Sequence, residues 1–240
     1  MSHNSPPMHT PESPFVLSDI TALVLAGGRG LRMGGVDKGL QPFRGQPMAL
    51  HALQRLANQY GGPLHGLHSV LINANRNADD YQALGEAAWG DGRVRVFADR
   101  VLDFSGPLAG FQAGLDLCTS PLLLTVPCDS PLLPRDLAQR LLDALNAEQA
   151  DIAMVQAPEA GRDGQITLRS QPVFCLMRAS LLGSLTEFLA GGGRKVDAWT
   201  AQHRVVHVPF NLVGDDPYAF ANANTLDELR RLEKTWFSKP

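Results

Sequence analysis

The chain has 240 residues, of which 44% are hydrophobic, and its formal net charge at pH 7 is -3. This length and apolar content predict one compact domain, and the small negative charge argues against nucleic acid or a membrane surface as its partner. The three cysteines, Cys118, Cys128 and Cys175, form no CxxC pair, which disfavours a disulfide framework or a zinc site. We therefore expect a cytoplasmic protein that binds a small molecule.

The first 19 residues contain four prolines and several small polar residues, and they lack the apolar stretch of a secretory signal. We predict a disordered N-terminal tail at 1–19 and one domain at 20–240. The longest apolar runs after the tail, such as "PLLLTVPC", are far shorter than the ~20 residues that cross a bilayer. We therefore expect no membrane partner.

From residue 20 onward, short aliphatic runs alternate with helix-like stretches. We predict strands at 22–26, 70–73, 93–97, 122–126, 152–156, 173–177 and 205–208. We predict helices at 47–59, 80–89, 108–117, 134–148, 180–190 and 226–236. This alternation is typical of a single Rossmann-like α/β domain, with a mostly parallel central sheet and helices on both faces.

Polar loops follow the first four predicted strands. They read "GGRGLRMGG", "NANRN", "ADRVLDFSGPLAG" and "PCDSP" in chain order. In open α/β sheets, ligands bind outside the carboxyl ends of the strands. The four loops therefore predict one binding site at that edge of the sheet.

The first of these loops belongs to the glycine-rich stretch "LVLAGGRGLRMGGVDKGL". Its backbone suits phosphate oxygens, but Met33 breaks the GxGxxG pattern and no Gly-Lys-Ser/Thr ending completes a Walker A loop. Arg29, Arg32 and Lys38 could surround a polyphosphate. The alternative is an ordinary turn whose glycines satisfy tight geometry and whose basic side chains face water.

Asp129 is the best candidate for a metal ligand, because "LLLTVPCDS" brings its carboxylate directly off a buried strand. Mg2+ prefers one or two carboxylates together with phosphate oxygens and water. The alternative is a carboxylate that caps a turn. We interpret the neighbouring Cys128 as a packing residue.

The segment Leu25-Ala26-Gly27-Gly28, with Asp37-Lys38 at the end of the loop, resembles the signature of nucleotidyltransferases that activate small molecules with NTPs. The version "RMGGVDKGL" is similar to that of the molybdenum cofactor guanylyltransferases, the MobA family. The resemblance extends through "INANR", "GPLAG", "VPCDSP", "QPVF" and "FANANTLDEL". It implies a fold of the nucleotide-diphospho-sugar transferase type.

The reaction that this resemblance implies is the transfer of GMP from GTP to the terminal phosphate of Mo-molybdopterin. The products would be molybdopterin guanine dinucleotide and pyrophosphate, and the cofactor would be Mg2+. Molybdenum-insertion and molybdoenzyme-chaperone proteins are the further partners that the resemblance suggests.

The resemblance also implies a role for individual residues. It implies that Arg32, Lys38 and Asp129 are catalytic, with Asp129 as the metal ligand. It implies GTP contacts from Leu25, Ala26, Gly27, Gly28, Lys38, Asn73, Asp99 and Asp129, and acceptor contacts from Gly106, Gly110, Asn222 and Asn224. A carboxylate can accept from N1–H and from the N2 amine of guanine, and Asp103 competes with Asp99 for that role.

Two alternatives remain open at this point. One is another NTP-dependent enzyme, such as a molybdopterin cytidylyltransferase or a sugar-1-phosphate nucleotidyltransferase. The other is a regulator that binds a nucleotide without turnover. The presence of both Lys38 and Asp129 argues against this alternative, because nucleotide binding alone does not require the metal-binding carboxylate.

Several polar residues carry no role in this hypothesis. We expect His203 and His207 to be satisfied or exposed histidines, and Asp215-Asp216 to be solvated cap residues. We read "GGGRKVDAW" either as a basic stretch near the pterin phosphate or as a helix C-cap followed by a new helix.

Overall fold

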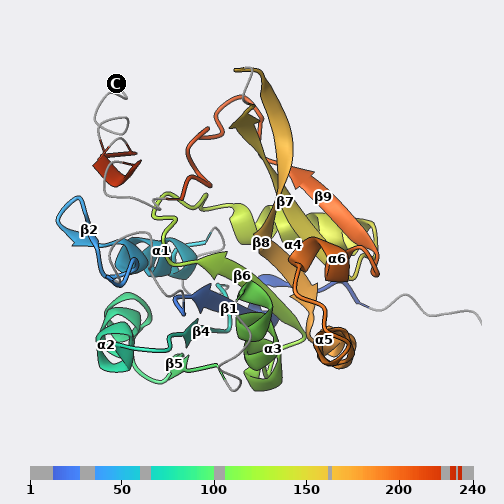
Figure 1. Cartoon of the computed structure of the whole chain (residues 1–240), viewed down its shortest axis with the longest axis horizontal. Helices are drawn as coiled ribbons and strands as arrows, with labels where there is room; N and C mark the ends of the chain where they lie inside the picture. The colour runs from blue at the N-terminus through green and yellow to red at the C-terminus, as the bar shows by residue number, and fades with distance from the viewer. Residues whose placement is uncertain are drawn as a thin grey trace, which may run out of the picture.

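The computed structural model describes residues 13–27, 36–59, 66–99, 106–161, 164–222, 228–230 and 232–233. Its centre is a seven-stranded sheet in the order β5-β4-β1-β6-β8-β7-β9 (Figure 1). The strands are β1 (Ile20–Leu25), β4 (Ser69–Asn73), β5 (Val94–Phe97), β6 (Leu122–Pro127), β7 (Ile152–Ala160), β8 (Ile166–Arg178) and β9 (Val205–Pro209). A separate two-stranded ribbon pairs β2 (Pro42–Phe43) with β3 (Gln46–Pro47).

The seven predicted strands of the central sheet are confirmed, and so is its mostly parallel character. β1 pairs in parallel with β4 and β6, β4 with β5, and β7 with β9. Only β8 is antiparallel to its neighbours β6 and β7. β8 also begins at Ile166, seven residues before the prediction, and its first half forms a hairpin with β7 that projects from the sheet (Figure 1).

Helices cover both faces of the sheet, as predicted. Residues of α1 (Met48–Ala57), α2 (Ala78–Trp89) and α4 (Leu137–Ala147) share one core cluster with alternate positions of the strands. Residues of α3 (Pro107–Leu117), α5 (Leu182–Ala190) and α6 (Val196–Thr200) share the cluster on the opposite face. Successive strand residues point to opposite faces, so Val24 belongs to the first cluster and Leu23 to the second.

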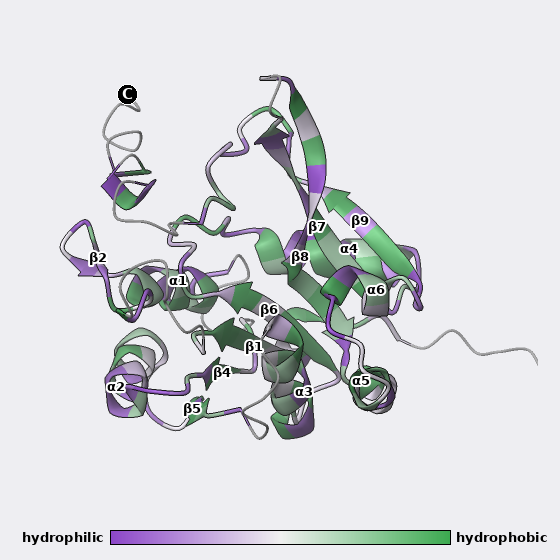
Figure 2. Ribbon diagram, viewed as in Figure 1, coloured by the Kyte–Doolittle hydropathy of each residue, from purple (hydrophilic) through white to green (hydrophobic). Residues whose placement is uncertain are grey.

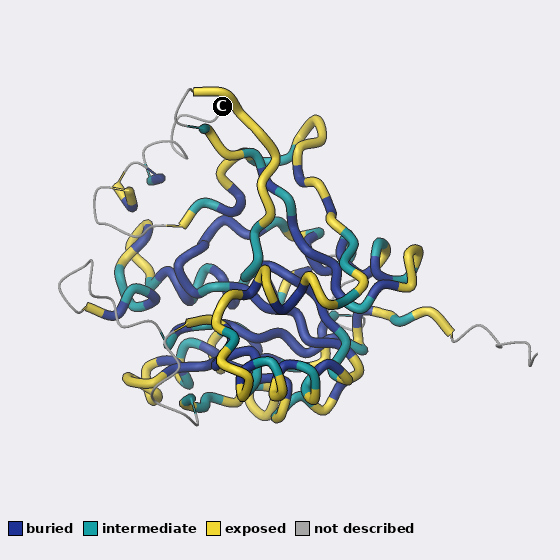
Figure 3. The backbone as a smooth tube through the Cα atoms, turned by 45° about the vertical axis from the view of Figure 1, so that its right-hand side comes forward, coloured by how far each residue is buried: buried dark blue, intermediate teal, exposed yellow. Residues whose placement is uncertain are grey.

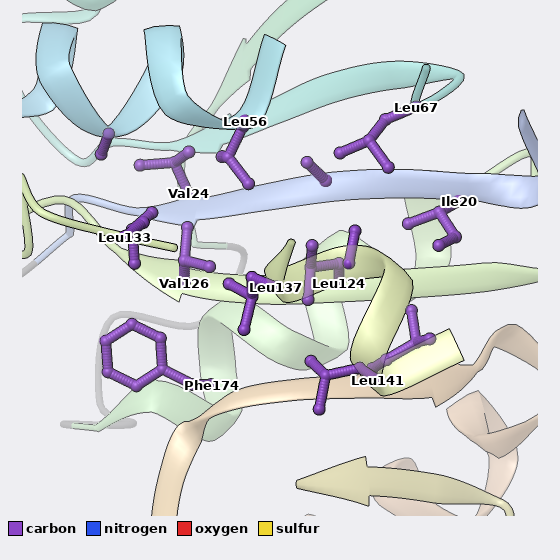
Figure 4. Close-up of a cluster of buried hydrophobic side chains, with 14 of the residues drawn as sticks. Ile20, Val24, Leu56, Leu67, Leu124, Val126, Leu133, Leu137, Leu141 and Phe174 are labelled. Atoms are coloured by element: carbon purple, nitrogen blue, oxygen red, sulfur yellow. The ribbon is translucent and has the colours of Figure 1, made fainter. Parts of the chain in front are cut away.

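The central strands are apolar along their length (Figure 2) and consist largely of buried residues (Figure 3). Their residues contribute to the core clusters on both faces of the sheet. Figure 4 shows the first cluster, in which Val24 and Leu56 lie on one side of the sheet with Leu124, Leu137 and other side chains. A strand that is buried on both faces reads as a continuous aliphatic run. This is why the sequence pattern identified β1, β4 and β6.

The N-terminal segment that precedes β1 packs on the domain. Both backbone groups of Phe15 bond to the amide of Asn146, with Phe15 N–H to Oδ1 at 3.1 Å and Nδ2 to Phe15 C=O at 2.9 Å. Leu17 is buried in the 3-10 helix η1 (Leu17–Asp19). Residues 15–19 thus differ from the expected disorder, because Phe15 and Leu17 contact elements that are distant in the sequence. Residues 1–12 lie outside the described residues.

The predicted helices agree with the observed ones to within a few residues at each end. α4 begins at Leu137 and not at residue 134, because Pro134 and the residues after it form a turn before the helix. Of the helix predicted at 226–236, residues 228–230, 232 and 233 are described, and they are helical. No helix in the described ranges is both long and apolar enough to cross a membrane.

Candidate active site at the carboxyl edge of the sheet

The register of the sheet brings the ends of four strands to one level. Leu25 pairs with both Asn73 and Pro127, and Asn73 pairs with Phe97. Each of these four residues is followed two positions later by a residue of a polar loop, namely Gly27, Asn75, Asp99 and Asp129. The predicted convergence of the four loops is therefore confirmed, and it follows from the parallel register.

Lys38 and Asp129 meet at this edge. Lys38 Nζ lies 3.4 Å from Asp129 Oδ2, and the two side chains are 23% and 12% exposed. A charge-assisted N–H···O bond is normally about 2.7 to 2.9 Å long, so the pair forms a loose ion contact. The ammonium group can therefore exchange this partner for a phosphate oxygen.

Burial raises the pKa of the Asp129 carboxyl above its ordinary value. The positive charge of Lys38, and the hydrogen bond from it, oppose this effect, while the negative charge of Glu228 adds to it. The raised pKa reports the desolvation of the charged form. A cation that approaches Asp129 would remove part of this penalty, which makes the carboxylate a suitable ligand for a metal ion.

The residue before Lys38 is held inside the protein. Asp37 is 9% exposed, and it accepts hydrogen bonds from Tyr81 Oη at 2.5 Å, Asn77 Nδ2 at 3.0 Å and the Gly39 backbone N–H at 3.2 Å. Burial raises the pKa of the Tyr81 hydroxyl, which therefore stays protonated and remains a donor. These bonds fix the chain on both sides of Lys38.

A close approach of the backbone completes this anchor. A Cβ atom on Gly39 would lie 2.4 Å from Tyr81 Oη and 3.0 Å from Cys128 Sγ, so only glycine fits there. Burial raises the pKa of the Cys128 thiol well above its ordinary value, and the charges of Asp129 and Asp37 raise it further. The interpretation of Cys128 as a packing residue is confirmed.

Asp99 is fixed by two asparagines from the end of β4. Asn73 Nδ2 donates to Asp99 Oδ1 at 2.9 Å, and Asn75 Nδ2 donates to Asp99 Oδ2 at 2.7 Å. Asn73 is 3% exposed, so its side chain supports Asp99 from below the surface of the site. A direct contact of Asn73 with a nucleotide stays a prediction.

Two glycines allow these amides to pack against the ends of β1 and α3. A Cβ atom on Gly27 would lie 2.9 Å from Asn75 Nδ2, and one on Gly110 would lie 2.7 Å from Asn73 Oδ1 and 2.5 Å from Leu25 Cδ2. The structure thus gives Gly110 a packing role inside α3. Gly106 is the N-cap of α3, as the motif "GPLAG" predicts, with a φ of 150° that favours glycine.

Asn222 reaches the same region from the far end of the chain. Ser130 Oγ donates to Asn222 Oδ1 at 2.5 Å, which places Asn222 next to the loop that carries Asp129. This contact gives a function to Ser130, a position to which the sequence analysis assigned no role. Gly28, Arg32, Asp103 and Asn224 lie outside the described residues, and their roles stay predictions.

Three features outside the site can also be assessed. His203 is satisfied by a contact of 3.0 Å between its Nε2 and Ser184 Oγ, as expected. The stretch "GGGRKVDAW" is the end of α5 followed by α6, which is the second of its two readings. The expectation that Asp215 is solvated is wrong, because Arg140 Nη1 binds its Oδ1 at 2.8 Å and both side chains are less than a fifth exposed.

The donor set at Asp129 fits Mg2+ only with help from a ligand. No group of three or more His, Cys, Asp or Glu side chains in the described ranges could hold a metal ion. Mg2+ commonly binds through one or two carboxylates and completes its shell with phosphate oxygens and water. The buried carboxylate of Asp129, 3.4 Å from the Lys38 ammonium group, fits that mode.

The fold and the site define an open-sheet α/β protein with a lysine and a carboxylate beyond the ends of its central strands. The chain belongs to the MobA-like NTP transferase domain family, whose domain matches residues 22–207. It is therefore a nucleotidyltransferase.

Proteins named molybdenum cofactor guanylyltransferase are similar to nearly the whole chain. The one from Albidiferax ferrireducens is 59% identical over 215 residues, which cover 90% of this chain and 96% of that protein. The one from Acidovorax sp. is 58% identical over 216 residues, with 90% and 95% covered. The crystal structure of molybdopterin-guanine dinucleotide biosynthesis protein A from Archaeoglobus fulgidus has the same fold, with a TM-score of 0.65, 19% identity, and coverage of 91% of this chain and 100% of that one.

Proposed function

We propose that the protein transfers GMP from GTP to the terminal phosphate of Mo-molybdopterin, and that the products are molybdopterin guanine dinucleotide and pyrophosphate. Family membership supports nucleotidyl transfer, and the names of the relatives support guanine and the molybdenum cofactor. The observation that carries the proposal is the Lys38–Asp129 pair at the edge where the four loops meet.

In the proposed reaction, a terminal phosphate oxygen of the acceptor attacks the α-phosphorus of GTP. The new P–O bond joins the acceptor to GMP, the bond from the α-phosphorus to the bridging oxygen breaks, and pyrophosphate leaves with that electron pair. Two anions must approach one another, so positioning and neutralisation of charge make the main contributions. Lys38 exchanges its loose contact with Asp129 for the triphosphate and neutralises part of its charge.

Asp129 would hold Mg2+, which supplies the remaining positive charge at the reacting phosphates. The anchor around Asp37 keeps Lys38 in reach of those phosphates. Arg32 is the second proposed cation of the loop, placed by the family resemblance at the phosphates or at the leaving group.

The ends of the central strands would bind the rest of the nucleotide. We propose backbone contacts from Leu25, Ala26, Gly27 and Gly28, with guanine recognised by Asp99 supported by Asn73. The Asp99 carboxylate can accept from N1–H and from the N2 amine of guanine together. That pair of donors distinguishes guanine from the other bases.

We propose that the acceptor binds at the same edge of the sheet, in contact with the N-terminus of α3 and with the segment that carries Asn222. The N-terminal N–H groups of a helix favour a phosphate, and Gly106 begins α3 at this edge. Gly110 would contribute by allowing α3 to approach the sheet, and Asn222 and Asn224 would contact the pterin side.

The three cysteines are free thiols, which is the state that a reducing compartment maintains. We propose the cytoplasm as the location. We also propose that molybdenum-insertion and molybdoenzyme-chaperone proteins supply and receive the cofactor, and pull-down experiments with each protein test this.

The reaction is tested with GTP that carries a radioactive α-phosphorus, incubated with Mg2+ and Mo-molybdopterin. We expect the label in the dinucleotide product and none in the released pyrophosphate. The variant Asp129→Asn should lose the transfer, whereas Asp79→Asn, an exposed residue of α2, should retain it. Release of labelled GMP without the dinucleotide, or full activity of Asp129→Asn, would contradict the proposal.

A further inference from the structure

We propose that Asn75 is a positioning residue for nucleotide selection, which fixes the Asp99 carboxylate so that two of its lone pairs face the base. This inference rests on the proposed function, since it concerns how the same site selects guanine. Asn75 lies two residues beyond the end of β4, at the level shared by Gly27, Asp99 and Asp129.

The amide of Asn75 connects three loops. Its Nδ2 donates to Gly27 C=O at 3.3 Å and to Asp99 Oδ2 at 2.7 Å, and its Oδ1 accepts from the Asp99 backbone N–H at 2.8 Å. A primary amide has two N–H donors, and both are used in these bonds. Asn75 therefore has no donor left for a ligand, and we infer that it acts on a nucleotide through Asp99 and Gly27, the two residues to which it donates.

The Asp99 carboxylate is oriented by one donor on each oxygen. Asn73 donates to Oδ1 and Asn75 donates to Oδ2. An ionised carboxylate offers about four lone-pair sites, so each oxygen keeps one acceptor site beyond these two bonds. Two adjacent acceptors on a fixed plane match the adjacent N1–H and N2–H donors of guanine.

The exposure of Asn75 separates this role from a role in folding. Its side chain is exposed, whereas Asn73 is buried. A hydrogen bond contributes only about 0.5 to 1.5 kcal/mol net to stability, and loss of an exposed amide leaves no buried polar group unsatisfied. The variant Asn75→Ala should therefore fold, while the Asp99 side chain and backbone gain freedom of movement.

The test compares GTP with ITP, which lacks the N2 amine, in the wild-type protein and in Asn75→Ala. We expect KM for GTP to rise about tenfold with little change in kcat, because ground-state and transition-state binding of the base are lost equally. We expect a much smaller change for ITP, so that the preference for GTP over ITP falls several-fold. Asn58→Ala is the matched control, since Asn58 is an exposed asparagine whose Nδ2 bonds to Gln54 C=O at the end of α1.

A second variant tests whether the hydrogen-bond donor of Asn75 holds the negatively charged Asp99 carboxylate in place. Asn75→Asp keeps the shape and an acceptor for the Asp99 N–H, but it replaces the amide donor with a second carboxylate. It should raise KM for GTP more than Asn75→Ala does.

Three results would overturn the inference: an unchanged KM for GTP in Asn75→Ala, an equal loss for GTP and ITP, or a milder effect of Asn75→Asp than of Asn75→Ala. A wild-type protein that uses neither GTP nor ITP would instead overturn the proposed function.

Discussion

Lys38 and Asp129 are 91 positions apart in the sequence, and Lys38 Nζ lies 3.4 Å from Asp129 Oδ2. The lysine comes from the loop after β1 and the aspartate from the loop after β6, and β1 and β6 are neighbouring parallel strands. Burial disfavours the charged form of the Asp129 carboxyl. The distance of 3.4 Å to Lys38 is longer than that of a strong charge-assisted hydrogen bond. We propose that the pair binds a metal ion together with the phosphates of the nucleotide.

We predict that Asp129→Asn abolishes pyrophosphate release without destabilising the fold. The substitution removes a buried charge and keeps the shape of the side chain, so the free energy of unfolding at neutral pH should change by less than about 1 kcal/mol or increase. Urea unfolding measures the stability, and a coupled pyrophosphate assay measures the activity. A loss of stability above about 2 kcal/mol would show that Asp129 has a structural role.

We predict that the acid limb of kcat/KM lies above the ordinary pKa of an aspartate. Burial raises the pKa of Asp129, and the carboxylate must be ionised to bind a cation, so activity falls as the pH falls through this raised value. The variant Lys38→Gln removes a charge that lowers the pKa, and its acid limb should move to still higher pH. Profiles of kcat/KM from about pH 5 to about pH 8 check this. The titration of GTP itself affects both proteins equally. An acid limb at the same pH in Lys38→Gln and in the wild type would therefore contradict the assignment to Asp129.

The raised pKa also predicts how stability depends on pH. Because the folded state binds the Asp129 proton more tightly than the unfolded state, this contribution to stability is fully present below the unfolded value and is lost as the pH rises through the folded value. The unfolding free energy of Asp129→Asn relative to wild type should therefore increase with pH and then level off. A difference that is constant from about pH 4 to about pH 8 would contradict the raised pKa.

We predict that Tyr81→Phe weakens both folding and catalysis. The substitution removes the hydrogen bond of 2.5 Å to Asp37, and a bond to a charged group contributes about 1.5 to 3 kcal/mol. The loop that carries Lys38 should become more mobile. We therefore expect a larger relative decrease in kcat than the relative increase in KM. The exposed Tyr218 provides the control, and equal effects of Tyr81→Phe and Tyr218→Phe would contradict the role of the anchor.

We predict opposite effects for two helical glycines. A Cβ atom on Gly110 meets Leu25 and Asn73, whereas a Cβ atom on Gly183 in α5 has no heavy atom within 4 Å. Gly110→Ala should lower the free energy of unfolding by about 1 to 3 kcal/mol through overpacking, and Gly183→Ala should raise it by up to about 1 kcal/mol through helix propensity. Thermal unfolding compares the two, and a neutral Gly110→Ala would contradict the packing role of this glycine.

The sequence was sufficient for the sheet wherever burial produces a continuous aliphatic run, as in β1, β4 and β6. It was insufficient for the first half of β8, where "ITLRS" is exposed and is held by pairing with β7 and not by burial. It was also insufficient at Phe15 and Leu17, whose burial depends on contacts with distant elements such as Asn146 in α4. Local composition carries no information about such contacts.

The candidate site could be predicted to the level of its loops and of the meeting of Lys38 and Asp129. The supporting residues could not, because Tyr81, Asn77 and Asn75 are ordinary in sequence and act only through the partner that the fold supplies. One signal was available for Asn75. It shares the offset of two residues beyond a strand end with Gly27, Asp99 and Asp129, and a parallel sheet places such positions at one level.

The central claim is that this site transfers GMP, and the most direct measurement supplies GTP, ATP, CTP and UTP separately with Mg2+ and Mo-molybdopterin. Pyrophosphate release is followed, and the pterin product is identified by its mass. We predict turnover with GTP alone and a product that contains one GMP. Turnover with CTP and none with GTP would contradict the claim.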